Sequence, residues 1–269
     1  MINSNMILSK IEREKIINYL SRSTRVDGRK LTDYRKIYKK TGLIEKASGS
    51  AFVSFGNTKV IAGVKVETGE PYLDKPDEGV LTVNVELVPL ASPSFEAGPP
   101  RENAIELARV VDRGLRESKA IDLKKLCIIS GKLVFVIFVD IYVLDHGGNL
   151  FDTAALASIL ALINTKIKEY SLSKDGLLKF KNSTINLPIQ NFPIEVTVSK
   201  IGNKFIVDPT LEEEVMIETQ VTIAIGKGNK ICAIQKSGNG TFSQDEIYKA
   251  MEIARDKAKE LRTKVLREG

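Results

Sequence analysis

Apolar and polar residues alternate along much of the first half of the chain, and this period of two predicts β-strands. Residues 50–67 are divided by Gly56-Asn57, a two-residue loop suited to positive φ, so they predict a β-hairpin. Residues 79–90 also alternate, with apolar side chains on one face and polar ones on the other. Residues 132–144 are apolar on both faces, which predicts a central strand.

Three segments have the character of an α-helix. A helix is expected from about Glu102 to Lys119, with most of its apolar residues along one side. Residues 150–163 are apolar all round, so this helix must be covered on every side. Residues 1–20 predict an amphipathic helix. They do not resemble a signal peptide, because charges interrupt the apolar stretch and no cleavage site follows.

The second half of the chain repeats the pattern of the first. Strand pairs are expected around Gly202-Asn203 and around residues 226–229. A capping box of Ser243 and Glu246 then opens a last helix, which runs through about residue 262. The repeat predicts a duplicated α+β unit, whose copies either share one core or form separate domains.

The polar, basic and irregular stretch 164–192 is expected to be a connector between the two halves. This gives an N-terminal helical extension over 1–24, a first half with the connector over 25–192, and a second half over 193–269.

Composition narrows the class of protein without naming a function. The chain has 269 residues, of which 28% are charged and 43% hydrophobic, as is typical of globular proteins. The net charge of +6 favours a polyanion such as nucleic acid, but an excess of surface lysine explains it equally well. The most apolar stretch, Leu150–Ile163, is too short to span a bilayer and contains Asp152, so we expect a cytoplasmic protein with no membrane contact.

Few residues offer metal or redox chemistry. Cys127 and Cys232 lie in apolar surroundings and predict buried, inert thiols. The single histidine, His146, excludes a site with two histidine ligands, and no cofactor or metal is expected. An acidic run could bind Mg²⁺, but such a run is more often a solvated strand end. Its members are Glu212, Glu213, Glu214 and Glu218.

The helix expected after residue 101 carries a row of arginines. Arg109, Arg113 and Arg116 fall within about 60° of one another at 100° per residue. Their guanidinium groups could bind phosphates. The alternative is a solvated face with ion pairs to Glu106 and Asp112, which lie at suitable helical spacing.

A Gly-rich turn joins the apolar strand that ends near residue 144 to the apolar helix after it. The N-terminus of such a helix suits a phosphate, because its N–H groups are unpaired and its dipole end is positive. The turn reads Asp145, His146, Gly147, Gly148 and Asn149, so it lacks the hydroxyl and the cation that a working phosphate site usually adds.

Several stretches together resemble the RNase PH family, which includes the ring subunits of exosomes. They are TRVDGRKLTDYR (24–35), ASGSAFVSFGNTKVIAGV (47–64), GPPRENAIELARVVDRGLRESKAIDL (98–123), LDHGGNLFDTAALAS (144–158) and FIVDPTLEEEVMIETQVTIA (205–224). The third and fourth are most similar to the non-catalytic RNase PH-like subunit of the archaeal exosome. The resemblance covers nearly the whole chain, from about Thr24 to the last helix.

The resemblance implies a duplicated α+β fold, related to domain 2 of ribosomal protein S5. Active members of the family shorten RNA from its 3′ end by phosphorolysis, in which inorganic phosphate attacks the terminal linkage and releases a nucleoside diphosphate. Phosphate rests on a Gly-Ser-Arg turn at a helix N-terminus, and an Asp in a Glu-x-Asp stretch helps proton transfer. The first group neutralises charge and the second supplies a proton to the leaving oxygen.

The matching positions of this chain lack both groups, which implies a subunit that does not catalyse. The turn Gly147-Gly148-Asn149 leaves only backbone amides, and the acidic stretch ends in Gln220, which cannot exchange a proton at neutral pH. Arg109 and Arg113 match arginines that, in this type of subunit, reach the RNA path beside the neighbouring active site. Arg116 is expected on the RNA or at the subunit interface, and His146 has a structural or incidental role.

The resemblance also implies partners. Such a subunit alternates with a catalytic RNase PH-like subunit in a ring of three heterodimers, acts on single-stranded RNA, and carries RNA-binding cap proteins on one face. Two other functions remain open. An active phosphorolytic exoribonuclease needs a cation at 147–149 and a carboxylic acid at 220. A ribosome-associated, S5-like binding module predicts a shorter chain without a duplication.

Overall fold

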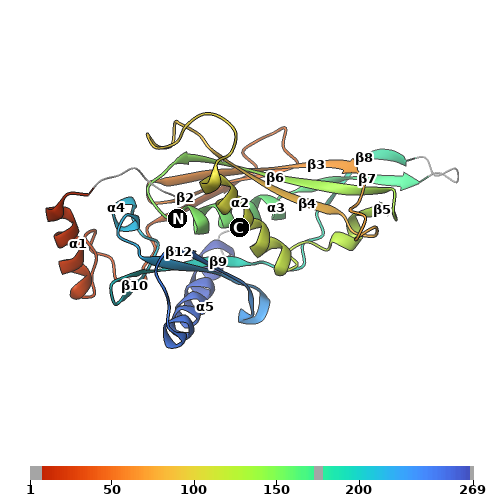
Figure 1. Cartoon of the computed structure of the whole chain (residues 1–269). Helices are drawn as coiled ribbons and strands as arrows, with labels where there is room; N and C mark the ends of the chain where they lie inside the picture. The colour runs from red at the N-terminus through yellow and green to blue at the C-terminus, as the bar shows by residue number, and fades with distance from the viewer. Residues whose placement is uncertain (1–7, 173–177, 267–269) are drawn as a thin grey trace.

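The computed structural model describes residues 8–172 and 178–266 and arranges them as two main β-sheets with helices between and beside them (Figure 1). The larger sheet has the strand order β1-β2-β3-β6-β4, with the short β5 also paired to β6. All these neighbours are antiparallel except β4 and β6, which run parallel. Its strands are β1 (Ile37–Thr41), β2 (Gly49–Phe55), β3 (Thr58–Gly69), β4 (Val80–Leu87), β5 (Cys127–Ile129) and β6 (Leu133–Asp145).

The predicted hairpin and central strand are confirmed in this sheet. Phe55 of β2 pairs with Thr58 of β3, and Gly56 between them takes a φ of 55°. Strand β6 lies between β3 and β4. Its two faces differ, however, because Val139 is fully buried while Tyr142 is 43% exposed. The apolar residues on its second face, such as Phe138, are therefore only partly buried.

The second half of the chain forms the smaller sheet, with the order β10-β9-β11-β12. Helix α5 packs on its outer face (Figure 1). The predicted capping box at Ser243 and Glu246 is present, and α5 extends beyond the expected end at Arg262. The elements are β9 (Ile194–Ile201), β10 (Lys204–Val207), α4 (Leu211–Glu214), β11 (Thr219–Ile225), the 3₁₀ turn η2 (Lys227–Asn229), β12 (Ile231–Gly238) and α5 (Gln244–Leu266).

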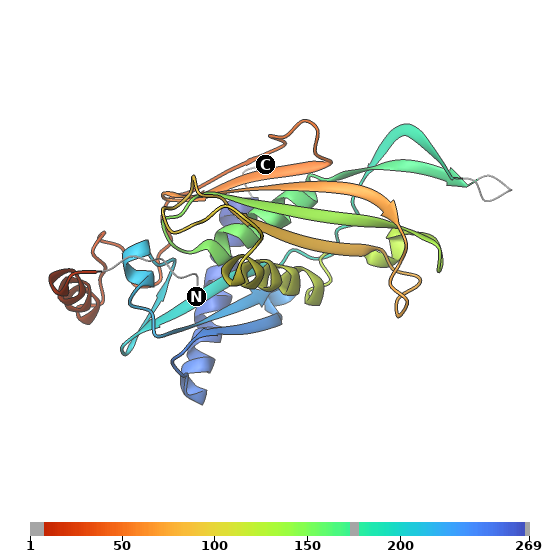
Figure 2. The ribbon, with the colours of Figure 1, turned by 45° about the horizontal axis from the view of Figure 1, so that its top comes forward.

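Two helices, α2 (Glu102–Glu117) and α3 (Leu150–Ile163), lie between the sheets (Figure 2). All residues of α3 except the last are buried, so the expectation that it is covered on every side is confirmed. One hydrophobic core includes Val53 of the larger sheet, Ile159 of α3 and Val198 of the smaller sheet. The two copies of the repeat therefore share a core.

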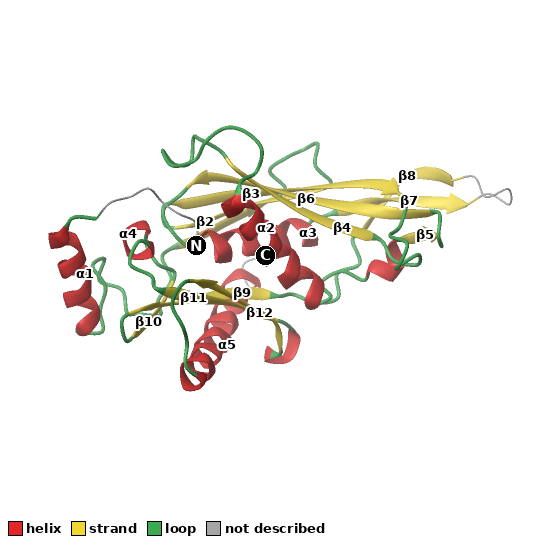
Figure 3. Ribbon diagram, in the orientation of Figure 1, coloured by secondary structure: helices red, strands yellow, loops and turns green. Residues whose placement is uncertain are grey.

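Residues 164–192 do not form the irregular connector expected from their polarity. They contain a two-stranded hairpin of β7 (Lys166–Leu172) and β8 (Leu178–Asn186), which projects from the body of the molecule (Figure 3). Aromatic side chains attach it to the larger sheet. The paired residues Tyr170 and Phe180 lie toward its turn, and their rings are 5.7 Å and 6.4 Å from the ring of Phe135 on β6. The polar composition reflects exposed strands rather than a lack of regular structure.

The N-terminal helix α1 (Lys10–Ser21) lies at the edge of the fold (Figure 1). It buries Ile16 and Leu20 but leaves Ile11 78% and Ile17 55% exposed. Residues 1–7 of the predicted helix lie outside the described residues.

A 3₁₀ turn, η1 (Leu123–Leu126), precedes β5. Among the described residues, no helix is both long and apolar enough to cross a membrane.

The two cysteines are free and half-buried, not buried as expected. Cys127 begins the short strand β5, and Cys232 lies on β12 at an edge of the smaller sheet. Apolar neighbours in sequence predicted burial, but an edge strand leaves part of its side chains accessible.

Candidate functional site

The predicted strand–turn–helix unit joins β6 to α3. Gly148 takes a φ of 94°, and a Cβ at this position would lie 2.4 Å from the carbonyl oxygen of Pro209. Asn149, at the N-cap of α3, is in the left-handed region, and its side chain makes no capping hydrogen bond to the helix. The turn is therefore packed against the segment of the second half that leads into α4.

The backbone amides of this turn are not vacant. The N–H of Gly147 donates to Thr58 Oγ1 at 3.2 Å, and that of Gly148 donates to His146 Nδ1 at 3.4 Å. The N–H of Asn149 donates to Glu214 Oε1 at 2.7 Å. Groups of the chain itself thus occupy the donors that the sequence left open for a phosphate.

A guanidinium group does reach the turn, although no cation lies within the turn itself. Arg35 donates to the carbonyl oxygens of Gly147 at 2.6 Å and Gly148 at 3.0 Å. It also forms an ion pair with Asp208 at 2.7 Å. Because Arg35 binds the carbonyl side of the turn and a buried carboxylate, it holds the turn in place.

Carboxylates and arginines connect the turn to the rest of the fold. Asp208, fully buried, accepts hydrogen bonds from Arg29, Arg35 and Asn149. Burial alone would raise the pKa of Asp208, but hydrogen bonds from Arg35 and its charge hold this pKa below the ordinary value. Burial raises the pKa of Asp152 to about 7, although its carboxylate accepts several hydrogen bonds.

His146 is buried beside the turn. Its ring stacks on Phe95 with a centroid distance of 5.4 Å. Burial, followed by the positive charge of Arg35, lowers the pKa of His146 to about 4. The imidazole is therefore neutral at physiological pH.

Gln220, which the sequence analysis matched to the family's acid, is buried within a sheet. Gln220 is 5% exposed and lies within β11, paired with Ser199 of β9 and Ser237 of β12. Its amide oxygen accepts a hydrogen bond from Ser199 Oγ at 3.4 Å. An amide in this place neither donates nor takes up a proton near neutral pH.

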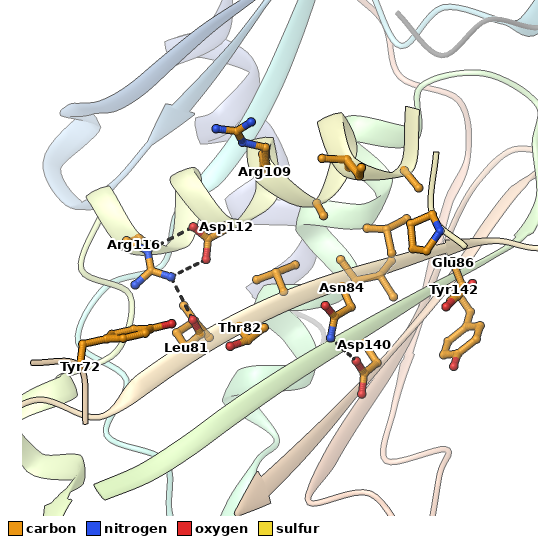
Figure 4. Close-up of a pocket in the computed structure, with 17 residues that line it drawn as sticks. Tyr72, Leu81, Thr82, Asn84, Glu86, Arg109, Asp112, Arg116, Asp140 and Tyr142 are labelled. Atoms are coloured by element: carbon orange, nitrogen blue, oxygen red, sulfur yellow. Dashed lines mark hydrogen bonds and ion pairs between the residues drawn. The ribbon is translucent and has the colours of Figure 1, made fainter. Parts of the chain in front are cut away.

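The arginine row lies along α2, beside strand β4 (Figure 4). Arg109 and Arg113 are exposed, and neither makes an ion pair or side-chain hydrogen bond with another described residue. Arg116 differs, because its guanidinium pairs with Asp112 at 2.7 Å and donates to the carbonyl oxygen of Leu81 at 2.9 Å. The expected ion pair with Asp112 is thus present at the C-terminal end of the row.

Two grooves flank the row. One of about 510 Å³ lies between α2 and β4, where Figure 4 shows Arg109 pointing away from Tyr142 and Asp140. The other, of about 630 Å³, takes in all three arginines together with four acidic residues. The acids are Glu102, Glu106, Asp112 and Glu117. Charge of both signs lines the surface, so Arg109 and Arg113 act as two separate cationic groups rather than as part of a uniformly basic patch.

The four carboxylates of the acidic run have different surroundings: Glu212 and Glu218 are exposed as expected, whereas Glu213 and Glu214 are bound within the fold. Glu213 is buried in an ion pair with Arg25, and Glu214 is taken up by the turn. Glu218 accepts the N–H of Gly202 at 2.9 Å, and Glu212 is exposed. Within the described part of the chain, no group of three or more His, Cys, Asp and Glu side chains is placed to hold a metal ion.

Comparison with known proteins identifies the family. Residues 33–168 match the 3′ exoribonuclease family, domain 1, and residues 191–257 match its domain 2. The chain belongs to the 3′ exoribonuclease family. A protein named exosome complex component Rrp42 from Thermococcus kodakarensis is 50% identical over 262 residues, covering 97% of this chain and 96% of that protein. The protein of the same name from Methanopyrus kandleri is 47% identical over 259 residues, covering 96% and 97%.

Solved structures share the two-part RNase PH-like fold. A chain in a structure described as the Archaeoglobus fulgidus exosome with RNA bound to the active site is 46% identical, with a TM-score of 0.87. The match covers 94% of this chain and 97% of that one. Rice Rrp46, at 16% identity and a TM-score of 0.67, covers 89% and 97% and shares the fold alone.

The sequence analysis missed three residues that define the state of this site within the 3′ exoribonuclease fold. Arg35 and Glu214 reach the turn from distant parts of the chain, and Asp208 joins them. Arg35 lies in the first family stretch, and Glu214 lies in the last one. Both residues therefore belong to stretches that carry the family resemblance. No rule of sequence spacing, however, predicts that either of them contacts residues 147–149.

Proposed function

We propose that this chain is a non-catalytic subunit of an archaeal-type exosome, a complex that degrades RNA from the 3′ end. It binds RNA and shapes the active site of a neighbouring catalytic subunit. The relatives named Rrp42 and the exosome chain of Archaeoglobus fulgidus, similar over nearly their whole lengths, support this assignment.

The observation that carries the non-catalytic role is the state of the turn before α3. It offers no hydroxyl and no cation for a phosphate nucleophile, because Arg35 faces the carbonyl side and is paired with Asp208. The second requirement, a group that transfers a proton, is absent at Gln220. Phosphorolysis needs both charge neutralisation and proton transfer. Because the turn lacks the first group and position 220 lacks the second, we infer that this chain does not catalyse the reaction.

RNA binding is assigned to the row on α2. Arg109 and Arg113 are exposed cations without a described partner, and a free guanidinium fork suits a phosphate. Arg116 is held by Asp112 and Leu81 and has less freedom to reach RNA. Arg116 therefore joins α2 to β4 through Leu81, and its contact with RNA or with a neighbouring subunit stays a prediction.

The proposal includes an assembly. The chain alternates with a catalytic RNase PH-like subunit in a ring of three heterodimers, RNA-binding cap proteins sit on one face, and the complex is cytoplasmic. Ring closure requires two different surfaces on each subunit. The division into 1–24, 25–192 and 193–269 is kept as the proposed organisation of the chain, and no cofactor is assigned.

The test is phosphate-dependent release of nucleoside diphosphates from single-stranded RNA. The chain alone is expected to release none. Co-expressed with an RNase PH-like subunit that retains the Gly-Ser-Arg turn and the Glu-x-Asp stretch, it is expected to elute as one assembly that degrades RNA. As a control, replacing the Asp of that catalytic subunit by Ala abolishes the activity of the assembly. Turnover by the chain alone at a rate comparable with the assembly contradicts the proposal.

A further inference from the structure

The N-terminus of α3 holds a carboxylate. Oε1 of Glu214 accepts the N–H of Asn149 at 2.7 Å, at the end of the helix where the dipole favours an anion. The second oxygen, Oε2, is buried and has no hydrogen-bond partner among the described residues. A side chain from α4 therefore lies where a helix of this kind binds a free anion.

A second donor is aimed at the same carboxylate. Because the N–H of Gly148 donates to Nδ1 of His146, the neutral ring carries its proton on Nε2. The His146 side chain is fully buried, and Nε2 lies 3.8 Å from Glu214 Oε2 without any hydrogen-bond partner in the described chain. This distance is too long for a hydrogen bond, so the slot contains a donor that the carboxylate does not satisfy.

The segment that delivers Glu214 is fixed at several points. Thr210 and Glu213 form a capping box that opens α4. Glu213 also accepts Nε of Arg25 at 2.9 Å, and the carbonyl oxygen of Pro209 sits against Gly148. Glu213 and Glu214, neighbours in sequence, thus bind two different sites, and α4 holds the second carboxylate in the slot.

We propose that the Glu214 carboxylate is a built-in occupant of the anion slot at the α3 N-terminus, so that the wild-type chain takes up no free phosphate there. Its removal converts the slot into a site for a tetrahedral oxyanion such as inorganic phosphate. Glu214→Ala removes four heavy atoms, close to the five of a phosphate ion. The Asn149 N–H and the His146 Nε2–H are the donors left to receive it.

The charges around the slot have both signs. Burial raises the pKa of Glu214 to about 7 and so opposes an anion, and the charge of Asp208 acts in the same direction. The N–H of Asn149 and the charge of Arg35 favour the anion. Asp208 is already balanced by Arg29 and Arg35 and by a hydrogen bond from Asn149. The carboxylate of Asp152, in the first turn of α3, accepts from Thr197, Tyr34 and Asn149. Attraction for an added anion comes from the helix end, Arg35 and the two donors, and it must exceed the cost of burying the charge.

The experiment compares the wild-type full chain with Glu214→Ala in inorganic phosphate and in chloride at equal ionic strength. Glu212→Ala is the matched control, because Glu212 is an exposed acid on the same short helix. For Glu214→Ala alone, phosphate is expected to raise the melting temperature, in proportion to the logarithm of its concentration once that exceeds the dissociation constant. The rise is about 3–6 °C at ten times the dissociation constant. Broadening of the phosphate ³¹P resonance should appear with this variant only.

Two results overturn the inference. One is equal stabilisation of wild type and Glu214→Ala by phosphate, which places the ion elsewhere. The other is no phosphate effect on a folded Glu214→Ala chain, which makes Glu214 a helix-end contact and nothing more. If the variant is unfolded in chloride, the same titration measures refolding, and phosphate but not chloride must restore the circular dichroism signal.

The inference builds on the proposed function only in comparing this slot with the phosphate site of catalytic relatives. Since no RNA or partner enters the measurement, its failure leaves the RNA and assembly tests untouched.

Discussion

Replacing Arg109 and Arg113 by Ala in the assembled ring separates RNA binding from a merely solvated face. Each exposed guanidinium that leaves a single-stranded RNA lowers the slope of log affinity against log salt by about 0.7, so the pair lowers it by about 1.4. Stability should hardly change. Neither side chain has a described partner, and Ala is at least as good a helix former as Arg. The assay is RNA binding at several salt concentrations, combined with phosphorolysis by the intact ring.

The matched control is Arg255→Ala with Lys259→Ala, two exposed cations with the same four-residue spacing on α5. It removes equal charge from a surface that the proposal does not assign to RNA. If the α2 and α5 variants lower the slope by the same amount, net charge explains the effect and the assignment of the row is wrong. If the α2 variant dissociates before RNA is added, as sedimentation would reveal, Arg109 and Arg113 belong to the subunit interface instead.

Two further predictions concern the buried polar groups. Arg25→Ala should lower the free energy of unfolding by about 3–5 kcal/mol, measured in urea, because it leaves buried Glu213 without its partner. His146→Gln should lower the free energy of unfolding by less at pH 5 than at pH 7.5. The difference between the two losses, measured in the same urea experiment, is roughly 2 kcal/mol. Below pH 6.5 His146 binds a proton in the unfolded wild-type chain, whereas in the folded chain, where its pKa is about 4, it stays neutral until the pH is lower. The wild type therefore loses stability at pH 5 that the Gln variant does not lose. An equal loss at both pH values contradicts the burial of His146.

Elements whose signal is local could be predicted from the sequence. The Gly56-Asn57 hairpin, the all-apolar helix α3 and the capping box of α5 each depend on neighbouring residues, and all three are present. The β7–β8 hairpin was missed because its strands are exposed on most sides, so no apolar alternation distinguishes them from a loop. Burial of Cys232 was wrongly expected because sequence does not say which strand lies at the edge of a sheet.

The candidate site was half predictable. The sequence alone shows that residues 147–149 contain no Ser or Arg and that residue 220 is not an acid, because comparison with a sequence motif needs no structure. What fills the turn instead depends on contacts between residues far apart in the chain. Asn149 and Glu214 are separated by 65 positions, and Arg35 lies 113 positions from Gly148. Acidic runs are usually solvated, so the structural roles of Glu213 and Glu214 had no local signal.

The turn before α3 is firmly held although it contains no Ser or Arg. Gly148 still permits close approach of the second half, and Arg35 still fixes both carbonyl groups of the turn. An open anion slot at this place would leave buried N–H groups unpaired, at a cost of about 1–3 kcal/mol for each. The carboxylate of Glu214 removes part of that cost and at the same time joins α4 to α3. In this chain the groups around the turn therefore hold the two halves together, and the proposed RNA contact lies elsewhere, at the arginine row on α2.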